Sequence, residues 1–471
     1  MEPPEDVQQI AAAGPEGEAS PKAVTIEVSL DEAVSMAVVF LKDGQLADAE
    51  RLLRAILDVA PNHPTALHYS GVLAHQQKRH DESIALIRRS LELDPAKADW
   101  HSNLGIVLKA AGKLEEAMAA YERAIDLDPG HAKARNNLGV LQRTKGLTAE
   151  AEVSYREAIR LNPQYAEAYH NLGTLLWNLR RVREAVLAFN RALVLGPAAP
   201  DTQRLLAGAH CELGEPEKAV LIYDDWLRHE PDNPVARHMR AACSGEAVPE
   251  RAADAFIEKA FDSFAATFDQ KLASLAYRAP QIVAAALADA GAPATGQLDV
   301  LDAGCGTGLC GPLLRPYARR LVGVDLSGRM LANAGKRNVY DDLCRAELTA
   351  YLAAHPASFD VIVSADTLVY FGALEEMANA AASALRPGGS LIFTVEAADG
   401  DCVPLGYRLH YHGRYLHTRG YLEDVLRRVG FRTDIGQAEL RMEGGLPVAG
   451  FVVRATASEA RGGPRNGADD A

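Results

Sequence analysis

The sequence lacks an excess of positive charge and any long apolar run. Its 471 residues contain 49 Lys and Arg against 63 Asp and Glu, which gives a formal net charge of −14. Binding to nucleic acid or to an anionic membrane surface depends on clustered basic residues, so we expect the chain to bind neither. The apolar runs are far shorter than the roughly 20 residues that a membrane-spanning helix needs.

Closely spaced cysteines are also missing. The six cysteines include no C-x-x-C pair, which argues against a zinc site and against a disulfide framework, and we expect no metal. The first 30 residues are acidic and rich in Pro, Gly and Glu, unlike the basic and apolar start of a signal peptide. We expect residues 1–30 and 457–471 to be disordered and the protein to be cytoplasmic.

The amino-terminal half does contain a period of 34 residues. Six prolines keep this spacing: Pro61, Pro95, Pro129, Pro163, Pro197 and Pro231. Six small residues keep it too: Ala49, Ser83, Ala117, Ala151, Ala185 and Ala219. A large apolar residue follows each small residue four positions later. A unit of 34 residues accommodates two helices that approach each other at the small residue, with a proline ending the second helix.

Glycines complete the repeated pattern. One set of four recurs with the same period at Gly71, Gly105, Gly139 and Gly173. A second set lies at the expected turn between the two helices, where a positive φ is often needed: Gly44, Gly112, Gly146 and Gly214. The pattern resembles the tetratricopeptide repeat. The resemblance implies an α-solenoid of six helix hairpins and a cap helix over residues 31–243, with a groove that binds a protein or peptide.

Three asparagines follow the same period. Asn103, Asn137 and Asn171 each precede a periodic glycine by two residues. Side chains repeated at the array period lie along one track, where carboxamides can hydrogen-bond an extended peptide backbone. A similar asparagine ladder holds peptides in the superhelical repeat domains of O-GlcNAc transferases. We predict that these asparagines bind a peptide, and the alternative is that they are tolerated consensus residues exposed to water.

The carboxy-terminal half has a different pattern. The 34-residue period ends near residue 244, and residues 244–255 are predicted to form a linker. Phe261, Phe264, Phe268 and Leu272 then recur at spacings of three and four, which predicts one helical stripe. Strands and helices alternate over residues 256–456, which predicts an α/β domain with a mostly parallel sheet. The expected strands are residues 298–303, 320–324, 343–346, 359–364, 390–396, 431–440 and 447–455.

A glycine-rich loop follows the first expected strand. The sequence Gly304-Cys305-Gly306-Thr307-Gly308 permits a sharp turn and a close approach of the backbone to a ligand. Asp325 ends the second strand, where a carboxylate can accept both hydroxyls of a ribose. A dinucleotide fingerprint would need Gly or Ala where Leu309 stands.

The compressed Gly-x-Gly-x-Gly, preceded by Asp302, resembles the loop of class I S-adenosylmethionine-dependent methyltransferases. Other segments agree in order and spacing: Glu347 after the third strand, residues 366–370 after the fourth, and the Arg-Pro-Gly-Gly turn at 386–389. With the repeats in front, the chain is similar to bacterial methyltransferases that contain tetratricopeptide repeats. The resemblance implies a Rossmann-like domain that uses S-adenosylmethionine.

The resemblance also implies a set of cofactor-binding residues. These are Asp302, Gly304, Gly306, Gly308, Asp325, Leu326, Met330 and Glu347. The glycines and Asp302 would surround the methionine part, Asp325 would hold the ribose, and the last three would contact the adenine. The alternatives are solvated strand-end acids for Asp325 and Glu347, and plain core packing for Leu326 and Met330.

The catalytic residues are less sharply specified. A methyl group on a sulfonium is already electrophilic, so a general base is needed only if the acceptor must lose a proton. The candidates are Asp366 and Tyr370, at the end of the fourth strand, and His410. His410 lies in residues 407–417, which are expected to cover the substrate, although they could form an ordinary exposed hairpin.

The sequence therefore predicts a cytoplasmic S-adenosylmethionine-dependent methyltransferase whose repeats recruit a protein or peptide substrate. Two alternatives remain at this point. One is a methyltransferase of small molecules that is docked by its repeats. The other is a scaffold whose cofactor-binding domain does not catalyse a reaction.

Overall fold

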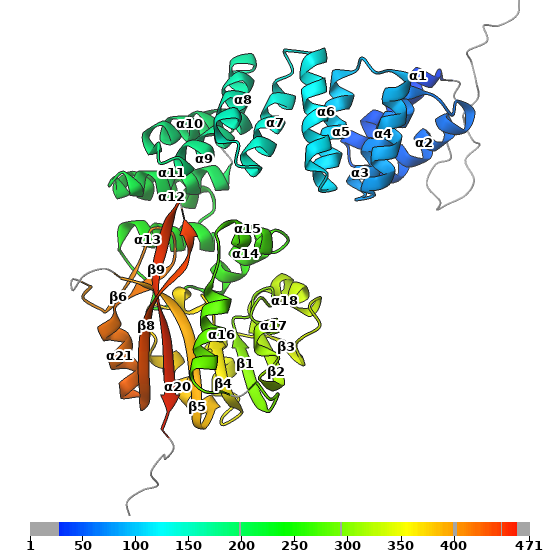
Figure 1. The fold of residues 1–471 in the computed structure, drawn as a ribbon. Helices are drawn as coiled ribbons and strands as arrows, with labels where there is room; N and C mark the ends of the chain where they lie inside the picture. Colours follow the sequence, from blue (N-terminus) through cyan, green and yellow to red (C-terminus); the bar gives the residue numbers. More distant parts are fainter. Residues whose placement is uncertain (1–27, 197–198, 293, 399–402, 444, 459–471) are drawn as a thin grey trace, which may run out of the picture. The chain divides into compact units, whose positions relative to one another are not determined.

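A computed structural model describes residues 28–196, 199–292, 294–398, 403–443 and 445–458 (Figure 1). The tails predicted to be disordered lie outside these residues, apart from 28–30 and 457–458. Two compact units make up the chain. The first comprises the residues through Leu176 together with Leu187–Ala199, and the second comprises Trp177–Val186 and the residues from Pro200 onward.

Paired helices of nearly constant length follow one another through the repeats. They are α1 (Leu30–Lys42), α2 (Leu46–Val59), α3 (Pro64–Gln76), α4 (His80–Leu93), α5 (Ala98–Ala110), α6 (Leu114–Leu127), α7 (Ala132–Thr144), α8 (Thr148–Leu161), α9 (Ala166–Asn178) and α10 (Val182–Leu195). The sixth pair, α11 (Pro200–Glu212) and α12 (Pro216–His229), and the cap helix α13 (Pro234–Ser244) belong to the second unit. The predicted α-solenoid is confirmed.

The periodic small residues lie where the two helices of a repeat meet. All six, from Ala49 to Ala219, are completely buried. A Cβ atom on Gly105 would lie 2.6 Å from the ring of Tyr121, and one on Gly139 would lie 2.8 Å from the ring of Tyr155. Because interiors are close-packed, only glycine leaves room for the large residue of the second helix.

The turn between the two helices has a left-handed backbone. The four turn glycines have φ between 73° and 78°. In the second and fifth repeats the same position is taken by Lys78 and Arg180, each with φ of 62°. A side chain in this region costs about 1–2 kcal/mol, so these two turns are locally strained.

The second unit contains a nine-stranded sheet in the part of the chain that the structure describes. Its strands are β1 (Leu298–Ala303), β2 (Ala318–Asp325), β3 (Asp342–Arg345), β4 (Phe359–Ser364), β5 (Leu385–Ala397), β6 (Tyr407–Leu409), β7 (Tyr415–His417), β8 (Phe431–Glu443) and β9 (Leu446–Ala457). Strands β3-β2-β1-β4-β5 are parallel in that order, and β9 joins β5 and β8 in antiparallel fashion. The order reverses between β1 and β4, where open α/β sheets bind ligands.

Helices cover both faces of this sheet. They are α14 (Asp254–Phe264), α15 (Phe268–Ser274), α16 (Ala279–Asp289), α17 (Gly311–Leu314), α18 (Gly328–Gly335), α19 (Leu348–Ala353), α20 (Glu375–Ala384) and α21 (Arg419–Arg428). Alternate residues of β1 enter different cores: Val300 packs with Leu287 of α16, and Leu301 belongs to the cluster that contains Leu422 of α21. This two-residue alternation of buried side chains confirms the predicted Rossmann-like α/β domain.

One helix prediction was wrong. The phenylalanine stripe lies on two helices, because α14 ends at Phe264 and α15 begins at Phe268. The rings of Phe261 and Phe264 are nevertheless 5.4 Å apart, and those of Phe264 and Phe268 are 5.7 Å apart. A short non-helical break preserves this packing, so the spacing of the aromatics does not reveal it.

The segment predicted as a linker is attached to the sheet domain. Gly245, with φ of 69°, ends α13. Beyond it, Arg251 forms an isolated antiparallel bridge with Phe371, and the backbone N–H of Ala252 donates to the carbonyl of Tyr370 at 2.9 Å. Residues 246–253 therefore run along the edge of the domain that follows them.

Strands β4 and β7 occupy the same edge of β5 in succession. β4 pairs with β5 as far as Phe393, β7 begins to pair at Glu396, and β9 pairs along the opposite edge through Glu396. Between these two pairings, the N–H of Asp366 donates to the Thr394 hydroxyl at 2.9 Å. The chain leaves β4 here, at the carboxyl ends of the parallel strands.

Candidate functional site

A cavity of about 290 Å³ lies at the carboxyl ends of β1, β2 and β4. The glycine loop, the end of β2 and the residues after β4 form its floor, and α14 and α15 cover it. Its volume is close to the lower end of the range of about 300–1,000 Å³ that small-molecule sites occupy. All of its lining residues belong to the second unit.

The glycine loop adopts positive φ at all three glycines, with 76° at Gly304, 54° at Gly306 and 82° at Gly308. A Cβ on Gly304 would overlap the side chain of Thr367, so glycine is required at this position for packing as well. Gly304 and Gly306 line the cavity. Gly308 lies outside the lining residues, and a Cβ there would meet the ring of Tyr340 at 2.9 Å.

Asp325 holds the loop from the end of β2. Its Oδ2 accepts a hydrogen bond from the N–H of Gly306 at 2.9 Å, and its Oδ1 accepts one from the N–H of Ser327 at 2.8 Å. Burial raises the pKa of Asp325, while these backbone donors oppose the increase. The carboxylate therefore lines the cavity in a fixed orientation.

Two of the residues predicted to contact the adenine line the cavity. Leu326 follows Asp325 directly, and Glu347 begins α19 on the same side. Glu347 also caps that helix, since its carboxylate accepts hydrogen bonds from the N–H groups of Thr349 and Ala350. Its position is thus set by the helix that it caps.

Asp302 and Met330 are placed differently from the prediction. Both lie outside the lining residues and are almost completely buried. Asp302 accepts a hydrogen bond of 2.6 Å from the hydroxyl of Tyr340, and burial raises the pKa of Asp302 to about 7. Asp302 therefore supports the loop from behind through Tyr340, and Met330 packs in the core, so direct contact with a ligand has no geometric support.

Helix α15, which carries Phe268, is bound to the glycine loop. Phe268 of α15 lies 3.8 Å from the Cβ position of Gly306. The next residue, Asp269, accepts hydrogen bonds of 2.5 Å from the Thr307 hydroxyl and from Arg337. These contacts hold α15 over the loop, where Phe268 lines the cavity.

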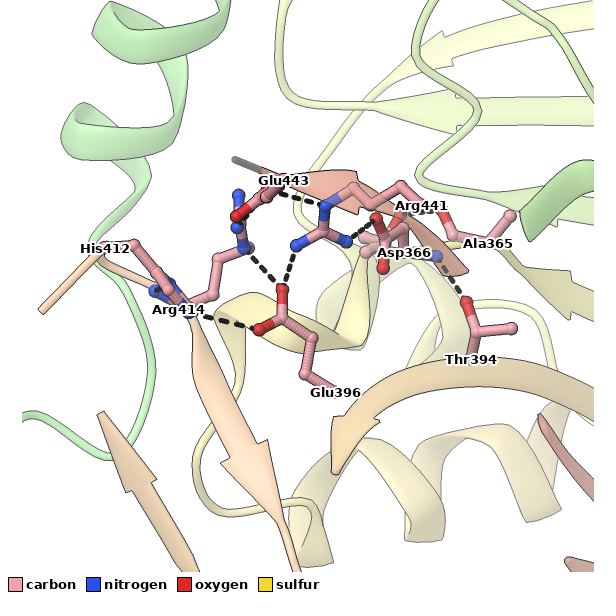
Figure 2. A network of polar contacts seen from close by, with 9 residues as sticks. Ala365, Asp366, Thr394, Glu396, His412, Arg414, Arg441 and Glu443 are labelled. Atoms are coloured by element: carbon pink, nitrogen blue, oxygen red, sulfur yellow. Dashed lines mark hydrogen bonds and ion pairs between the residues drawn. The ribbon is translucent and has the colours of Figure 1, made fainter. Parts of the chain in front are cut away.

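A buried ionic network forms the opposite end of the cavity (Figure 2). Arg441 of β8, which is only 3% exposed, donates from Nη1 to Asp366 Oδ2 at 2.7 Å. It also donates from Nε to Glu443 at 2.7 Å and pairs through Nη2 with Glu396. One guanidinium thereby joins three carboxylates from three segments of the sheet.

Residues of the turn between β6 and β7 extend this network. Arg414 donates from Nη2 to Glu443 at 2.6 Å, and its Nε lies 2.5 Å from Glu396. His412 Nε2 lies 3.2 Å from the other oxygen of Glu396. Burial opposes ionisation of Glu396, but Arg414, His412 and Arg441 outweigh it and keep the pKa of Glu396 well below its usual value.

Asp366 and Tyr370, two of the predicted catalytic residues, line the cavity. Oδ1 of Asp366 is buried and has no hydrogen-bond partner among the described residues, and the backbone φ of this residue is 57°. Burial raises the pKa of Asp366 and raises that of Tyr370 to about 12. A phenol with a raised pKa stays protonated, so the carboxylate is the one of the two groups that can accept a proton.

His410 does not reach the cavity. It lies at the start of the β6–β7 turn, where its N–H donates to the carbonyl of Arg414 at 2.9 Å. Burial lowers the pKa of His410 to about 3. The predicted catalytic role of His410 therefore has no geometric support, and Arg414 is the residue of this turn that lines the cavity.

The sequence analysis missed Arg414, Arg441, Glu443 and Lys271, all of which line the cavity. No sequence pattern marks Arg441, because its burial directly after the buried Leu440 is visible only in the structure. Two adjacent buried residues break the two-residue alternation of a strand, and the pairing of β8 with β9 shifts register between Glu439 and Arg441.

In the first unit, the predicted asparagine track makes contacts between repeats. Nδ2 of Asn103 lies 3.1 Å from Nε2 of His68, and Nδ2 of Asn171 donates to Oδ1 of Asn136 at 3.0 Å. Each partner precedes its asparagine by 35 residues, which places it in the preceding repeat. With Asn137, all three track residues are half-buried. An amide can form up to four hydrogen bonds, so these contacts do not exhaust the capacity of the track.

Family comparisons agree with both parts of this architecture. Residues 301–393 match a methyltransferase domain, and residues 34–98, 102–166 and 170–234 match the tetratricopeptide repeat. The chain therefore contains a methyltransferase domain preceded by tetratricopeptide repeats.

The curated relatives each match only part of the chain. A malonyl-[acyl-carrier protein] O-methyltransferase of Enterobacter lignolyticus is 36% identical over 21% of this chain and 39% of its own length. A probable S-adenosylmethionine-dependent methyltransferase of Mycolicibacterium smegmatis is 29% identical over 34% of this chain and 65% of its own. The chain thus spans less than two thirds of the length of either relative.

Among solved structures, pilF of Pseudomonas aeruginosa is similar at 19% identity, covering 45% of this chain and 96% of that one, with a TM-score of 0.41. No helix within the described ranges is long and apolar enough to cross a membrane. The same ranges hold no group of three or more His, Cys, Asp or Glu side chains arranged for a metal ion.

Proposed function

We propose that the protein transfers a methyl group from S-adenosylmethionine to an acceptor that its repeats recruit. The observation that carries this proposal is the cavity at the reversal of strand order, with Asp325 and the glycine loop on its floor. The methyltransferase family match over residues 301–393 supports the same reaction class.

The lining residues fit this cofactor. When bound, it supplies an electrophilic methyl group on a sulfonium. Asp325 holds the ribose: a carboxylate can accept about four hydrogen bonds, and two of the sites on Asp325 are taken by backbone N–H groups. Leu326 and Glu347 contact the adenine, and Gly304 and Gly306 let the backbone approach the methionine part.

The remaining walls position the acceptor. Phe264 and Phe268 close one side, and Asp366 and Tyr370 bound the end of β4. Alignment of two reactants in a closed site contributes on the order of 7–11 kcal/mol, so positioning supplies a large part of the catalysis of methyl transfer.

The repeat array recruits a protein or peptide, and the track of Asn103, Asn137 and Asn171 binds its backbone. The reaction takes place in the cytoplasm, without nucleic acid or membrane. One relative is named for an acceptor attached to acyl-carrier protein, which supports presentation of the acceptor by a protein. Other relatives are named for ubiquinone biosynthesis, so a small-molecule acceptor with repeat-mediated docking is the second candidate.

The test is incubation of the purified protein with methyl-labelled S-adenosylmethionine and host lysate, followed by separation of proteins from small molecules. Label in a protein fraction is the expected result. Label confined to small molecules would favour the docked small-molecule enzyme. No label in either fraction, with the cofactor bound, would favour a scaffold that does not catalyse the reaction.

A further inference from the structure

One oxygen of the Asp366 carboxylate has no hydrogen-bond partner among the described residues. Oδ2 accepts the hydrogen bond from Arg441, and the backbone N–H is bound by Thr394 (Figure 2). Oδ1 is buried, and the described residues offer it no hydrogen-bond donor. Leaving a buried charged acceptor unpaired is costly, so a ligand that supplies the missing donor gains affinity.

The surroundings hold this carboxylate in place. Its backbone φ of 57° is uncommon for a residue with a side chain, although Asp tolerates it better than most. Arg441 is fixed in turn by Glu396 and Glu443, so its Nη1 cannot move to serve Oδ1 as well. The orientation is therefore built into the sheet.

The two guanidinium groups at this end of the cavity are already paired with carboxylates. Three carboxylates, Asp366, Glu396 and Glu443, are joined by two guanidinium groups, Arg414 and Arg441. An additional carboxylate beside Asp366 would meet a like charge in a buried setting, where the repulsion is strong. A group that donates a hydrogen bond would meet the free Oδ1.

We infer that Oδ1 of Asp366 faces the position of methyl transfer and receives a hydrogen bond from the nucleophile, so that the acceptor is an amine or a hydroxyl and not a carboxylate. This inference rests on the proposed function. Arg441 is then a positioning residue, because it binds the opposite oxygen and leaves Oδ1 for the acceptor.

The reaction balances as follows. The acceptor atom forms a bond to the methyl carbon, the bond between that carbon and sulfur breaks, and its electron pair stays on sulfur as a neutral thioether. The proton of the acceptor N–H or O–H passes to Asp366 and leaves to solvent after product release. A carboxylate acceptor would have no proton to give, and Asp366 would have no function.

Sinefungin tests this placement without a known acceptor. In this analogue a carbon atom that bears an amino group replaces the sulfur and its methyl group, and the ammonium would meet Oδ1 of Asp366. S-Adenosylhomocysteine lacks that group and serves as the reference ligand. Calorimetry of the full chain should show sinefungin binding at least tenfold more tightly than S-adenosylhomocysteine.

Asp366→Asn should abolish that preference while leaving the affinity for S-adenosylhomocysteine within about threefold. The neutral amide can still accept from Arg441, so the fold should be kept, which the melting temperature verifies. Asp434→Asn is the matched control: Asp434 lies on β8, 70% exposed and paired with Arg454, and the variant should retain the full preference.

Each other outcome overturns the inference in a recognisable way. Equal sinefungin preference in wild type and Asp366→Asn would mean that Oδ1 does not face the transferred group. An equal loss for both ligands would place Asp366 at the amino-acid end of the cofactor. Binding of neither ligand to the wild type would refute the cofactor assignment itself, and the inference with it.

Discussion

The imidazole of His238 hydrogen-bonds the carbonyl oxygen of Gly413, 175 residues later in the chain, at 2.9 Å. His238 lies on the cap helix α13, where its ring stacks on Phe256 at 3.9 Å. Gly413 lies in the turn that carries His412 and Arg414 into the ionic network. The last helix of the repeats thus packs against the turn that contributes Arg414 to the cavity.

This relationship predicts where the chain can be divided. A fragment that starts at Ala166, and so keeps α11–α13, should bind S-adenosylhomocysteine like the full chain. A fragment 246–471 loses His238 and should bind at least tenfold more weakly and melt at a lower temperature. Calorimetry and thermal unfolding of both fragments measure this. Identical behaviour of the two fragments would show that the sheet domain does not depend on the cap helix.

Asp325 provides a test of the cofactor site. In the full chain, Asp325→Asn should weaken binding of S-adenosylhomocysteine at least tenfold. Charge-assisted hydrogen bonds contribute about 1.5–3 kcal/mol, and 1.4 kcal/mol corresponds to a factor of ten. NAD should not raise the melting temperature of the wild type. Asp342→Asn, at an exposed pair with Arg320, is the control and should bind normally. Undiminished binding by Asp325→Asn would contradict the ribose assignment.

The contribution of Asp302 to the stability of the second unit should fall as the pH rises from about 4 to about 7. Burial raises the pKa of Asp302 from its usual 3.8 to about 7 in the folded state. The folded protein therefore holds this proton more tightly than the unfolded chain does, and the resulting stability is present below pH 4 and lost through pH 7. Asp302→Asn should remove this pH-dependent loss of stability. Its melting temperature should therefore rise relative to that of the wild type between pH 5 and pH 8.

The variant Tyr340→Phe should keep the titration of Asp302 and shift it to higher pH. The Tyr340 hydroxyl donates to Asp302 and favours its ionised form. Without it, the pKa of Asp302 should rise further and the loss of stability should extend to higher pH. A wild type and an Asp302→Asn variant with parallel melting curves across this range would rule out the titration of Asp302 as the cause.

The asparagine track predicts a selective defect. Single changes of Asn103, Asn137 or Asn171 to Ala should be mild, because one net hydrogen bond contributes about 0.5–1.5 kcal/mol. The triple Ala variant should label the preferred protein substrate at least tenfold less at sub-saturating concentration, while S-adenosylhomocysteine binds as before. The contacts of Asn103 and Asn171 with the preceding repeats also predict a slightly lower melting temperature. Full labelling by a folded triple variant would exclude the track as the substrate-binding surface.

The repeats could be predicted from the sequence because each special position reflects a local steric requirement that recurs. Gly105 must leave space for Tyr121, and Gly112 must take a left-handed turn. The strands β1 and β4 were predicted with their observed bounds, since short apolar runs between turn signals are typical of buried parallel strands. The glycine loop and Asp325 followed from their fixed spacing.

The ionic network at the end of the cavity could not be predicted, because it is assembled by tertiary contacts. Arg441, Arg414 and Asp366 come from segments that meet only where β7 succeeds β4 beside β5. The sequence does not show which residue of 407–417 lies at the cavity. The turn begins at His410, and Arg414 lines the cavity instead. Local sequence patterns do not show which of these side chains reaches the cavity.

The hairpin of β6 and β7 is joined to the sheet through only two paired residues of β5, Glu396 and Ala397. The strands that carry the cofactor end of the cavity do not pair with it. A different turn between Leu409 and Tyr415 would therefore replace Arg414, a cation that lines the cavity, and the Gly413 carbonyl that binds His238, without changing a strand that bears the glycine loop or Asp325. One short turn thus determines both the cation at this end of the cavity and the contact with the cap helix.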